Sequence, residues 1–368
     1  TFYTNIDPSR TKGYELGLDA KLFNWRVGLD VTYYNQTTFD EIMNIPISNA
    51  NGFESASINA GEINNKGWEV MVNIVPVKTE DARWDLTFNF ARNRNKIVKL
   101  HPDAKTQTIA QADWISSLIT AEEGGSYGDI VGYDFKRTED GTPIIDANGL
   151  PIRSDEQVTL GNGQFDFTGG ITNSFAYKGF KVRALIQVKS GADLLSMTNQ
   201  KLHQQGVHIA TLEGRDEWSL SESAREDANI QPSNWVATGG YLANGVVENG
   251  TDVGGNTIYK TNDIFVDPRD YWGNVANAHI IQPFIYDASY VKLREVSVSY
   301  TLRTETLKKF KFINALTFSV IGRNLWLIHS NVPNIDPEST YSISNGQGYE
   351  YGSLPQRKSF GFNLTAKF

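Results

Sequence analysis

Apolar and polar residues alternate with a period of two in several segments of the chain, each close to the roughly ten residues that a tilted membrane strand needs. In one segment Leu16 and Leu18 share one parity and Asp19 takes the other. Because successive side chains of a strand point to opposite faces, each segment predicts a strand with one apolar and one polar face. The nine segments are 11–23, 25–37, 66–77, 84–94, 166–177, 180–189, 288–302, 315–327 and 359–368.

The segment 288–302 departs from strict alternation. Lys292 and Arg294 share the parity of Val296, so an uninterrupted strand would place two cations on its apolar face. We therefore predict a β-bulge in this segment, or an extension of the strand beyond the membrane.

The connections between the segments alternate between short and long along the whole chain. The short ones are Asn24, 78–83, 178–179 and 303–314, and the long ones are 35–65, 95–165, 190–287 and 328–358. Outer-membrane barrels sort their connections by end, with short periplasmic turns and long extracellular loops. The pattern predicts a transmembrane antiparallel β-barrel whose chain starts outside the cell and ends in the periplasm.

Composition supports an all-β fold. No run approaches the roughly 18 consecutive apolar residues of a membrane-spanning helix, which excludes a helical membrane protein. The 32 glycines and 12% aromatic residues suit strands and turns better than helices. A net charge of -8 argues against nucleic-acid binding, and the absence of cysteine removes disulfides and Cys-ligated metals.

Nine strands are an odd number, whereas bacterial single-chain barrels close with an even number. An open edge in lipid would leave backbone groups unpaired, so we expect further strands from an upstream part of the polypeptide. The chain starts at Thr1 without an initiator methionine or a signal peptide, which also leads us to expect a fragment.

Several stretches resemble the SusC/RagA-type TonB-dependent transporters, over nearly the entire chain. The stretches are RTKGYELGLD (10–19), INAGEINNKGWE (58–69), YDASYVKLREVS (286–297), GRNLW (322–326), NIDPE (334–338) and RKSFGFNL (357–364). They identify residues 1–368 as the C-terminal portion of one such barrel.

The resemblance implies properties that alternation and spacing do not show. It implies a 22-stranded outer-membrane barrel with an N-terminal plug and a TonB-contacting segment, both absent from this chain. It implies a partner lipoprotein of the SusD type that lids the extracellular mouth. The expected function is uptake of oligosaccharides or peptides with TonB-derived energy, without a cofactor.

Aromatic residues fall into two predicted classes. Trp25, Trp68 and Trp84 begin or nearly begin strands beside short turns, which predicts a girdle at the periplasmic membrane interface. The aromatics of the long loops are candidates for stacking on a ligand, with small loop cores or partner contacts as the alternative. These loop residues are Trp114, Trp218, Trp235, Tyr241, Tyr259, Tyr271 and Trp272.

Phe368 ends the last alternating segment. In outer-membrane proteins such an aromatic terminus resembles the signal that the barrel-assembly machinery recognises. The alternative is one more lipid-facing ring, and both roles are compatible.

Catalytic and metal-binding patterns are missing from the sequence. The histidines show no zinc spacing and are expected on loop surfaces: His101, His203, His208, His279 and His329. Asp140-Gly141 and 146–149 are explained better as turns than as Ca²⁺ ligands, because they lack the EF-hand spacing. No nucleophile elbow or nucleotide-binding loop occurs, so we expect no enzyme activity.

Two other functions remain as alternatives. A passive porin or adhesin barrel would lack the plug and the TonB-contacting segment. A soluble β-rich carbohydrate-binding protein would bury the apolar face against a second sheet.

Overall fold

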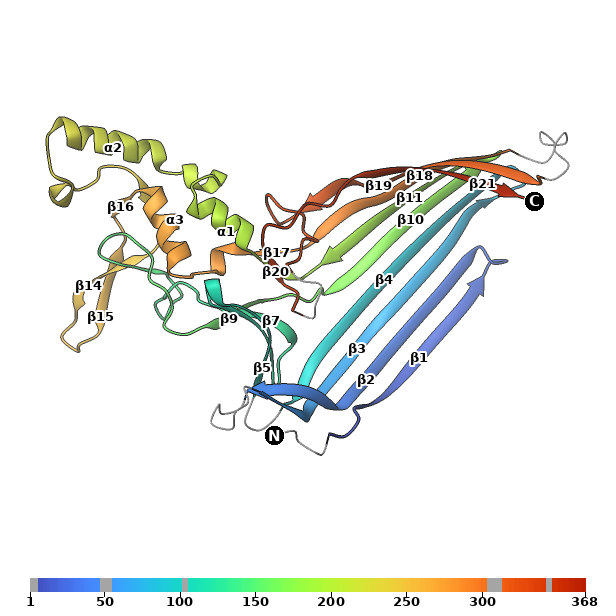
Figure 1. Ribbon diagram of the computed structural model, residues 1–368, viewed down its shortest axis with the longest axis horizontal. Helices are drawn as coiled ribbons and strands as arrows, with labels where there is room; N and C mark the ends of the chain where they lie inside the picture. Colours follow the sequence, from blue (N-terminus) through green and yellow to red (C-terminus); the bar gives the residue numbers. More distant parts are fainter. Residues whose placement is uncertain (1–5, 47–54, 101–104, 303–312, 342–345) are drawn as a thin grey trace.

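The largest element of the molecule is one nine-stranded antiparallel sheet, here called the wall sheet (Figure 1). The computed structural model describes residues 6–46, 55–100, 105–302, 313–341 and 346–368, without the side chains of 43–46, 55–58 and 60. The strands, each paired with the next, are β1 (Arg10–Leu22), β2 (Val27–Pro46), β3 (Ser55–Lys78), β4 (Ala82–Lys99), β10 (Phe167–Tyr177), β11 (Phe180–Ser190), β18 (Tyr290–Leu302), β19 (Ala315–Ser330) and β21 (Ser359–Lys367). Each of the nine predicted segments overlaps one strand of this sheet, which confirms the predicted strands though not all of their bounds.

The register of the strands places their apolar side chains next to one another, so that they form one continuous face of the sheet. In one row Leu18 pairs with Val31, Val31 with Val70, and Val70 with Phe90. A second row on the other half of the sheet contains Phe180, Tyr300, Phe318 and Leu364. These apolar side chains are uncovered, because no second sheet packs on them within the described residues. A sheet with such a face requires a partner other than water.

The predicted bulge in the segment 288–302 is confirmed. Register shifts interrupt the pairing of β18 with β11 at Leu185/Ile186 and with β19 at Val291/Lys292 and Leu293/Glu295. The shifts place Lys292 opposite Gln187, on the polar side of the sheet. The two cations therefore do not lie on the apolar face.

The three strands β2, β3 and β4 are longer than predicted, so the expected loop boundaries 35–65 and 95–165 are wrong. All of 35–46 and 55–65 is strand, and β4 continues to Lys99. Polar side chains pair across these extensions, as the Asn64 amide donates to Asn35 Oδ1 at 2.7 Å and to Thr37 Oγ1 at 2.9 Å. Alternation ends before the strand does, as is typical of barrel strands that extend beyond the hydrocarbon layer, where an apolar face is no longer needed.

Three of the long connections fold together into a second unit, here called the loop subdomain, built from residues 105–165, 191–289, 331–341 and 346–358. Its small sheets contain β5 (Thr106–Ala112), β6 (Ser117–Glu122), β7 (Tyr127–Gly132) and β9 (Val158–Asn162); β8 (Ile144–Ile145), β14 (Val246–Thr251) and β15 (Thr257–Thr261); β13 (Tyr241–Leu242) and β16 (Phe265–Val266); and β12 (Asp193–Ser196), β17 (Ile285–Asp287) and β20 (Tyr349–Glu350). Its helices are α1 (Met197–Gln204), α2 (Arg215–Asp227) and α3 (Pro268–Asn277), with single turns η2 (Asp113–Ile115), η3 (Ile209–Leu212), η4 (Pro232–Asn234) and η5 (Gln282–Phe284).

This subdomain has a core of its own. Ile119, Ile130, Val275, Ile280 and Phe284 are all fully buried in one cluster. None of the helices in the described ranges is long and apolar enough to cross a membrane.

The connections sort by end, as predicted from their lengths. Figure 1 shows the loop subdomain gathered at one end of the wall sheet, while the C-terminus lies at the other end. The short turns 23–26, 79–81 and 178–179 join β1 to β2, β3 to β4 and β10 to β11. Most of the fourth predicted short connection, 303–314, lies outside the described residues. The two ends of the sheet are thus structurally different.

Candidate functional site

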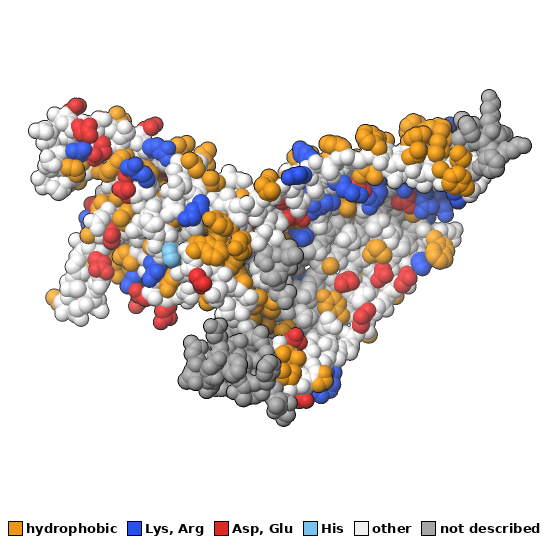
Figure 2. Space-filling model, viewed as in Figure 1, with side chains coloured by type: hydrophobic (Ala, Val, Ile, Leu, Met, Phe, Trp, Pro, Cys, Tyr) orange, Lys and Arg blue, Asp and Glu red, His pale blue; other side chains and the backbone are white. Residues whose placement is uncertain are grey.

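The polar face of the wall sheet is divided by charge. Alternation and register place acidic residues on β1–β4, namely Glu15, Asp19, Asp30, Glu69 and Asp85. They place basic residues on β11, β19 and β21, namely Lys181, Arg183, Lys189, Arg323 and Lys367. Figure 2 shows Lys and Arg along one side of the hollow and Asp and Glu along the other. The charge of this polar face therefore changes across the strands, from negative on β1–β4 to positive on β11–β21.

Local pairs reduce this gradient without removing it. On the acidic side Lys21 lies 3.5 Å from Asp19, and Arg83 lies 2.7 Å from Asp85. On the basic side Glu295 accepts from two arginines, with Arg183 Nη1 at 2.6 Å and Arg323 Nε at 3.0 Å. The remaining charges keep opposite signs on the two halves of the face.

A largely buried group of charges, here called the ion cluster, joins β18 to the loop subdomain. Its members are Tyr290, Lys292, Arg294, Asp336 and Glu338. Lys292, only 3% exposed, lies 3.0 Å from Asp336 and 2.9 Å from Glu338. Arg294 and Tyr290 also donate to Glu338. Because every charge is matched, the cluster ties the segment 331–341 to the wall sheet.

Glu338 is ionised by these neighbours. Burial by itself would raise the pKa of its carboxyl group. Hydrogen bonds from Arg294, Tyr290 and Lys292 outweigh burial and lower the pKa of Glu338 to about 2. The charged form therefore persists far below neutral pH.

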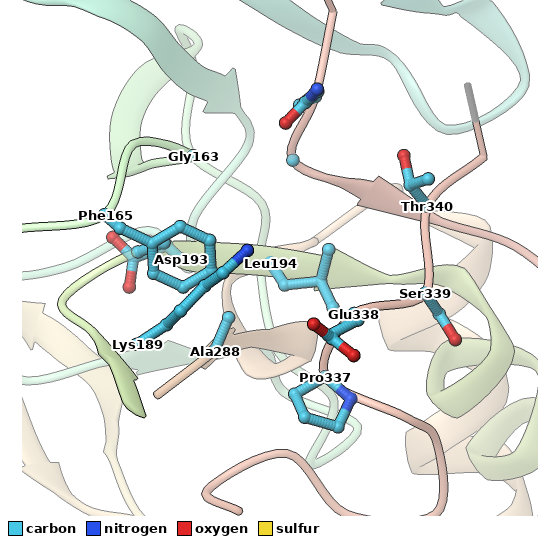
Figure 3. Close-up of a pocket in the computed structure, with 13 residues that line it drawn as sticks. Gly163, Phe165, Lys189, Asp193, Leu194, Ala288, Pro337, Glu338, Ser339 and Thr340 are labelled. Carbon is cyan, nitrogen blue, oxygen red and sulfur yellow. The ribbon is translucent and has the colours of Figure 1, made fainter. Parts of the chain in front are cut away.

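A pocket of about 210 Å³, here called the junction pocket, lies where the wall sheet meets the loop subdomain (Figure 3). Lys189 Nζ lies 4.9 Å from the centroid of the Phe165 ring, and Glu338 lies across the pocket from it. Asp193 accepts from the backbone of Asn162 at 2.9 Å. Burial, together with nearby carboxylates, raises the pKa of Asp193. The pocket offers a cation, an aromatic face and carboxylates to a polar ligand.

Three exposed aromatic rings form a second surface, here called the aromatic platform. Trp114, of η2, lies 5.9 Å from Tyr341 and 6.3 Å from Tyr351 between ring centroids. The three side chains are 47%, 54% and 44% exposed. The sequence predicted Trp114 but missed both tyrosines, because they lie in a segment without periodic signal and meet Trp114 only in the fold. Exposed rings of this kind can stack on a flat ligand face.

Three other predicted aromatics lie in or against the loop core instead. Tyr271 is only 7% exposed, and its ring centroid lies 4.5 Å from Tyr241 and 5.1 Å from Trp272. The structure thus places these rings in the alternative role of a small loop core. They support the subdomain and do not present a stacking face.

The remaining predicted loop aromatics lie apart from the platform. Trp218 and Trp235 belong to or flank α2, and Trp235 Nε1 donates to Ser221 Oγ at 3.2 Å. Tyr259 lies on the hairpin of β14 and β15 and is 37% exposed. They do not form one site with Trp114.

The predicted tryptophan girdle is divided between the two ends of the wall sheet. Trp25 lies in the turn after β1, and Trp84 near the start of β4 donates from Nε1 to Asn173 Oδ1 at 3.0 Å. Trp68 is not beside a short turn, because β3 begins at Ser55 and reaches its turn only after Lys78. Its expected place among the residues at the short turns is therefore wrong.

Trp68 belongs to the other end of the apolar face. Its ring centroid lies 4.8 Å from that of Tyr33, and Tyr33 lies 6.2 Å from Tyr14. Phe368 follows β21 at the short-turn end and is 79% exposed. Its role in assembly stays a prediction.

The expectation that all histidines lie on loop surfaces is wrong for His203. This side chain is 5% exposed, and its ring stacks on His208 at 3.8 Å in the loop core. Burial lowers the pKa of both histidines. His101 lies outside the described residues. No group of metal-ligating side chains occurs among the residues that the structure describes.

The predicted turns at the aspartates are confirmed. Gly141 and Gly149 have φ of 86° and 81°, values that favour glycine, and Gly149 N donates to Asp146 O at 3.0 Å. The Asp146 carboxylate caps its own turn by accepting from Asn148 N at 2.8 Å. These carboxylates have a structural role.

Comparison with known proteins gives consistent matches. The family model "TonB dependent receptor-like, beta-barrel" matches residues 1–325. TonB-dependent receptor P3 of Formosa agariphila is 28% identical over 99% of this chain and 34% of its own length. TonB-dependent receptor SusC of Bacteroides thetaiotaomicron is 28% identical over 49% of this chain and 19% of its own length.

Solved structures agree on the fold. The RagAB peptide transporter superposes with a TM-score of 0.64 at 16% identity, covering 98% of this chain and 35% of that chain. At this identity the likeness concerns the fold alone. The chain spans about a third of the length of the first curated relatives that it matches.

Proposed function

The chain belongs to the TonB-dependent receptor-like β-barrel family, and from this premise we propose that it forms part of the wall and mouth of an outer-membrane importer of nutrients. The observation that carries the proposal is the two-faced wall sheet. Its uncovered apolar face suits lipid, and its polar face suits a water-filled or plug-filled lumen. β1 and β21 are each paired on one side only in the described chain, which leaves two edges for the remaining strands of the barrel.

The difference between the two ends of the sheet supports a proposed orientation. Short turns and the C-terminus lie in the periplasm in our proposal, and the loop subdomain lies outside the cell. The distribution supports this because outer-membrane barrels have short periplasmic turns and long extracellular loops.

We propose that the whole transporter includes parts beyond this chain, because the chain spans about a third of the length of the first curated relatives. We propose that its N-terminal part supplies the plug and the contact with TonB, and that a SusD-like lipoprotein lids the loop subdomain. The family to which the chain belongs and its similarity to TonB-dependent receptor SusC support such an assembly. The transport is not enzymatic.

The cargo is an oligosaccharide or a peptide. The aromatic platform offers stacking faces to either ligand, and the junction pocket beside it offers charges and hydrogen-bonding groups. The platform residue Tyr341 directly follows the pocket residue Thr340 in the chain. We place the first cargo contact there.

One experiment tests the assembly. The intact transporter is purified from native outer membranes in mild detergent, and mass spectrometry identifies the proteins and glycans or peptides that accompany it. A SusD-like lipoprotein and a plug-bearing polypeptide are expected. A barrel without either partner contradicts the importer and favours a passive porin or adhesin.

A second experiment tests the cargo surface. Replacing Trp114, Tyr341 and Tyr351 together by alanine is expected to lower uptake of the co-purified cargo, because three exposed stacking faces are lost. Tyr259→Ala is the matched control, since this exposed ring lies on a separate hairpin. Equal uptake by both variants contradicts the platform.

A further inference from the structure

The outward face of the wall sheet changes character toward its long-connection end. Successive rows across β2, β3 and β4, read toward that end, are Val31–Val70–Phe90, Tyr33–Trp68–Arg92 and Asn35–Lys66–Arg94. An apolar row is followed by aromatic rings with one cation, and then by a polar and cationic row. Side chains meet hydrocarbon, interface and headgroups in this order on leaving a membrane.

A pocket of about 310 Å³, here called the lipid-side pocket, lies between the second and third rows. It is lined by Tyr33, Lys66, Gly67, Trp68, Arg92 and Arg94. Trp68 is 48% exposed, so its ring is open to a ligand. The pocket combines aromatic walls with three cations.

Two of these cations lack an ion-pair partner among the residues that the structure describes. Arg94 forms an ion pair with Asp166. Lys66 and Arg92 have no ion-pair partner within the described ranges, and both side chains are exposed. Two positive charges at the edge of an apolar face attract an anionic group.

A separate apolar groove of about 260 Å³ begins one row further toward the middle of the sheet, since Val70 and Phe90 of its lining occupy the row next to Trp68 and Arg92. Its lining includes Val70, Phe90 and Ile171, together with Gly169, which presents no side chain on the outward row. A free inorganic ion would gain nothing from these apolar side chains. It suits a hydrocarbon chain that is attached to the anion.

We propose that the lipid-side pocket binds the phosphate group of a membrane lipid, with an acyl chain of the same lipid in the apolar groove. Lys66 and Arg92 supply charge-assisted hydrogen bonds to the phosphate, and Trp68 covers the join between headgroup and chain. This inference rests on one part of the proposed function, that the wall sheet spans a membrane. The orientation proposed above adds that the lipid belongs to the outer leaflet.

The test uses the complete transporter in detergent, with lipid A as the probe. Retention of lipid A is measured by native mass spectrometry against its dephosphorylated form and against inorganic phosphate. The double variant Lys66→Gln/Arg92→Gln is expected to weaken binding of lipid A about 30-fold, because two cations near an anionic headgroup are lost. Lys66→Arg/Arg92→Lys keeps both charges and should restore most of the binding.

The matched control removes two cations from the polar face instead, as Lys181→Gln/Lys367→Gln. This variant should bind lipid A as the native transporter does, because these side chains face away from lipid. Equal binding by the Lys66/Arg92 variant, with its barrel folded by heat-modifiable mobility, overturns the proposal. Competition by inorganic phosphate as strong as by lipid A overturns it too. Cargo uptake is not part of the readout, so a failure here is distinguishable from failure of the importer.

Discussion

The wall sheet and the loop subdomain treat apolar side chains in opposite ways. Val298 and Val320, on interior strands of the wall sheet, are 46% and 48% exposed. Ile119 and Ile130, in the loop subdomain, are fully buried. The loop subdomain buries its apolar side chains in a core of its own, whereas neither face of the wall sheet is covered by a hydrophobic core.

The difference follows from the solvent that each unit faces. A unit surrounded by water must bury its apolar surface inside itself. A sheet between lipid and a polar lumen must keep its apolar side chains outward, where lipid covers them. The ion cluster lies where these two arrangements meet, and the following substitutions test each part.

Emptying the loop core should have the largest effect. Phe284→Ala is expected to destabilise the loop subdomain by about 3–5 kcal/mol, because the fully buried ring leaves a cavity. Phe88→Ala on the apolar face should cost less, since lipid chains refill the space. Hydrogen exchange in the intact transporter measures the difference, in the peptides around 275–284 for the first variant and around Phe88 for the second. Equal losses for both variants would contradict the contrast between the two units.

Breaking the ion cluster should release the joint between the units. Glu338→Gln leaves Lys292 and Arg294 facing an uncharged amide, and loss of one partner of a buried pair typically costs about 3–5 kcal/mol. Because Glu338 is partly exposed, we expect the lower end of that range. Limited proteolysis within 331–341 should accelerate, while Glu222→Gln on α2 should leave that segment protected.

Acid should release the same joint over a defined pH window. The pKa of Glu338 is lowered in the fold, so its carboxylate stabilises the folded state at neutral pH. This contribution is complete above the ordinary glutamate pKa and is lost as pH falls toward about 2. Exchange of 331–341 should therefore stay constant from neutral pH to about 4.5 and rise below it, relative to Glu338→Gln. A rise already near pH 6 would assign the effect to another group.

A charge on the apolar face should show where lipid begins. Leu29→Lys lies within the apolar band and is expected to cost about 2–4 kcal/mol, whereas Val27→Lys, beside the short turn, should cost about 0–1 kcal/mol. The free energy of unfolding from vesicles measures both. A larger cost for Val27→Lys would indicate a packed core in place of lipid.

Deleting Phe368 should have the smallest effect on stability. The side chain is exposed at the end of β21, so the folded barrel loses few contacts. Assembly in the outer membrane should nevertheless fall, if the terminal ring serves as the recognition signal. The amount of heat-modifiable barrel measures this effect, and an unchanged amount rejects the role.

The sequence predicted the wall sheet well because its signal is local. Each strand carries its own two-faced pattern, and the irregular parity of Lys292 and Arg294 marked the bulge. The same signal underestimated β2, β3 and β4, whose polar extensions do not alternate. Trp68 was misplaced for this reason.

The candidate site was predicted only in part. Trp114 and Tyr271 are both aromatic residues of long loops, so the sequence marks both as candidates for ligand stacking. The fold leaves Trp114 exposed and buries Tyr271. Tyr341 and Tyr351 join Trp114 from a segment more than two hundred residues away in the chain. Which rings stay exposed and which lie close together depends on contacts between distant segments, and the sequence around each ring does not show these contacts.

The sequence by itself determined that this protein is a two-faced antiparallel sheet with unequal ends, because alternation and connection length report the environment of each residue directly. Only the tertiary structure decided that the long connections form one core, that the ion cluster ties this core to β18, and which rings stay exposed. Those outcomes depend on packing between distant segments, where burial and charge matching are settled by the whole fold.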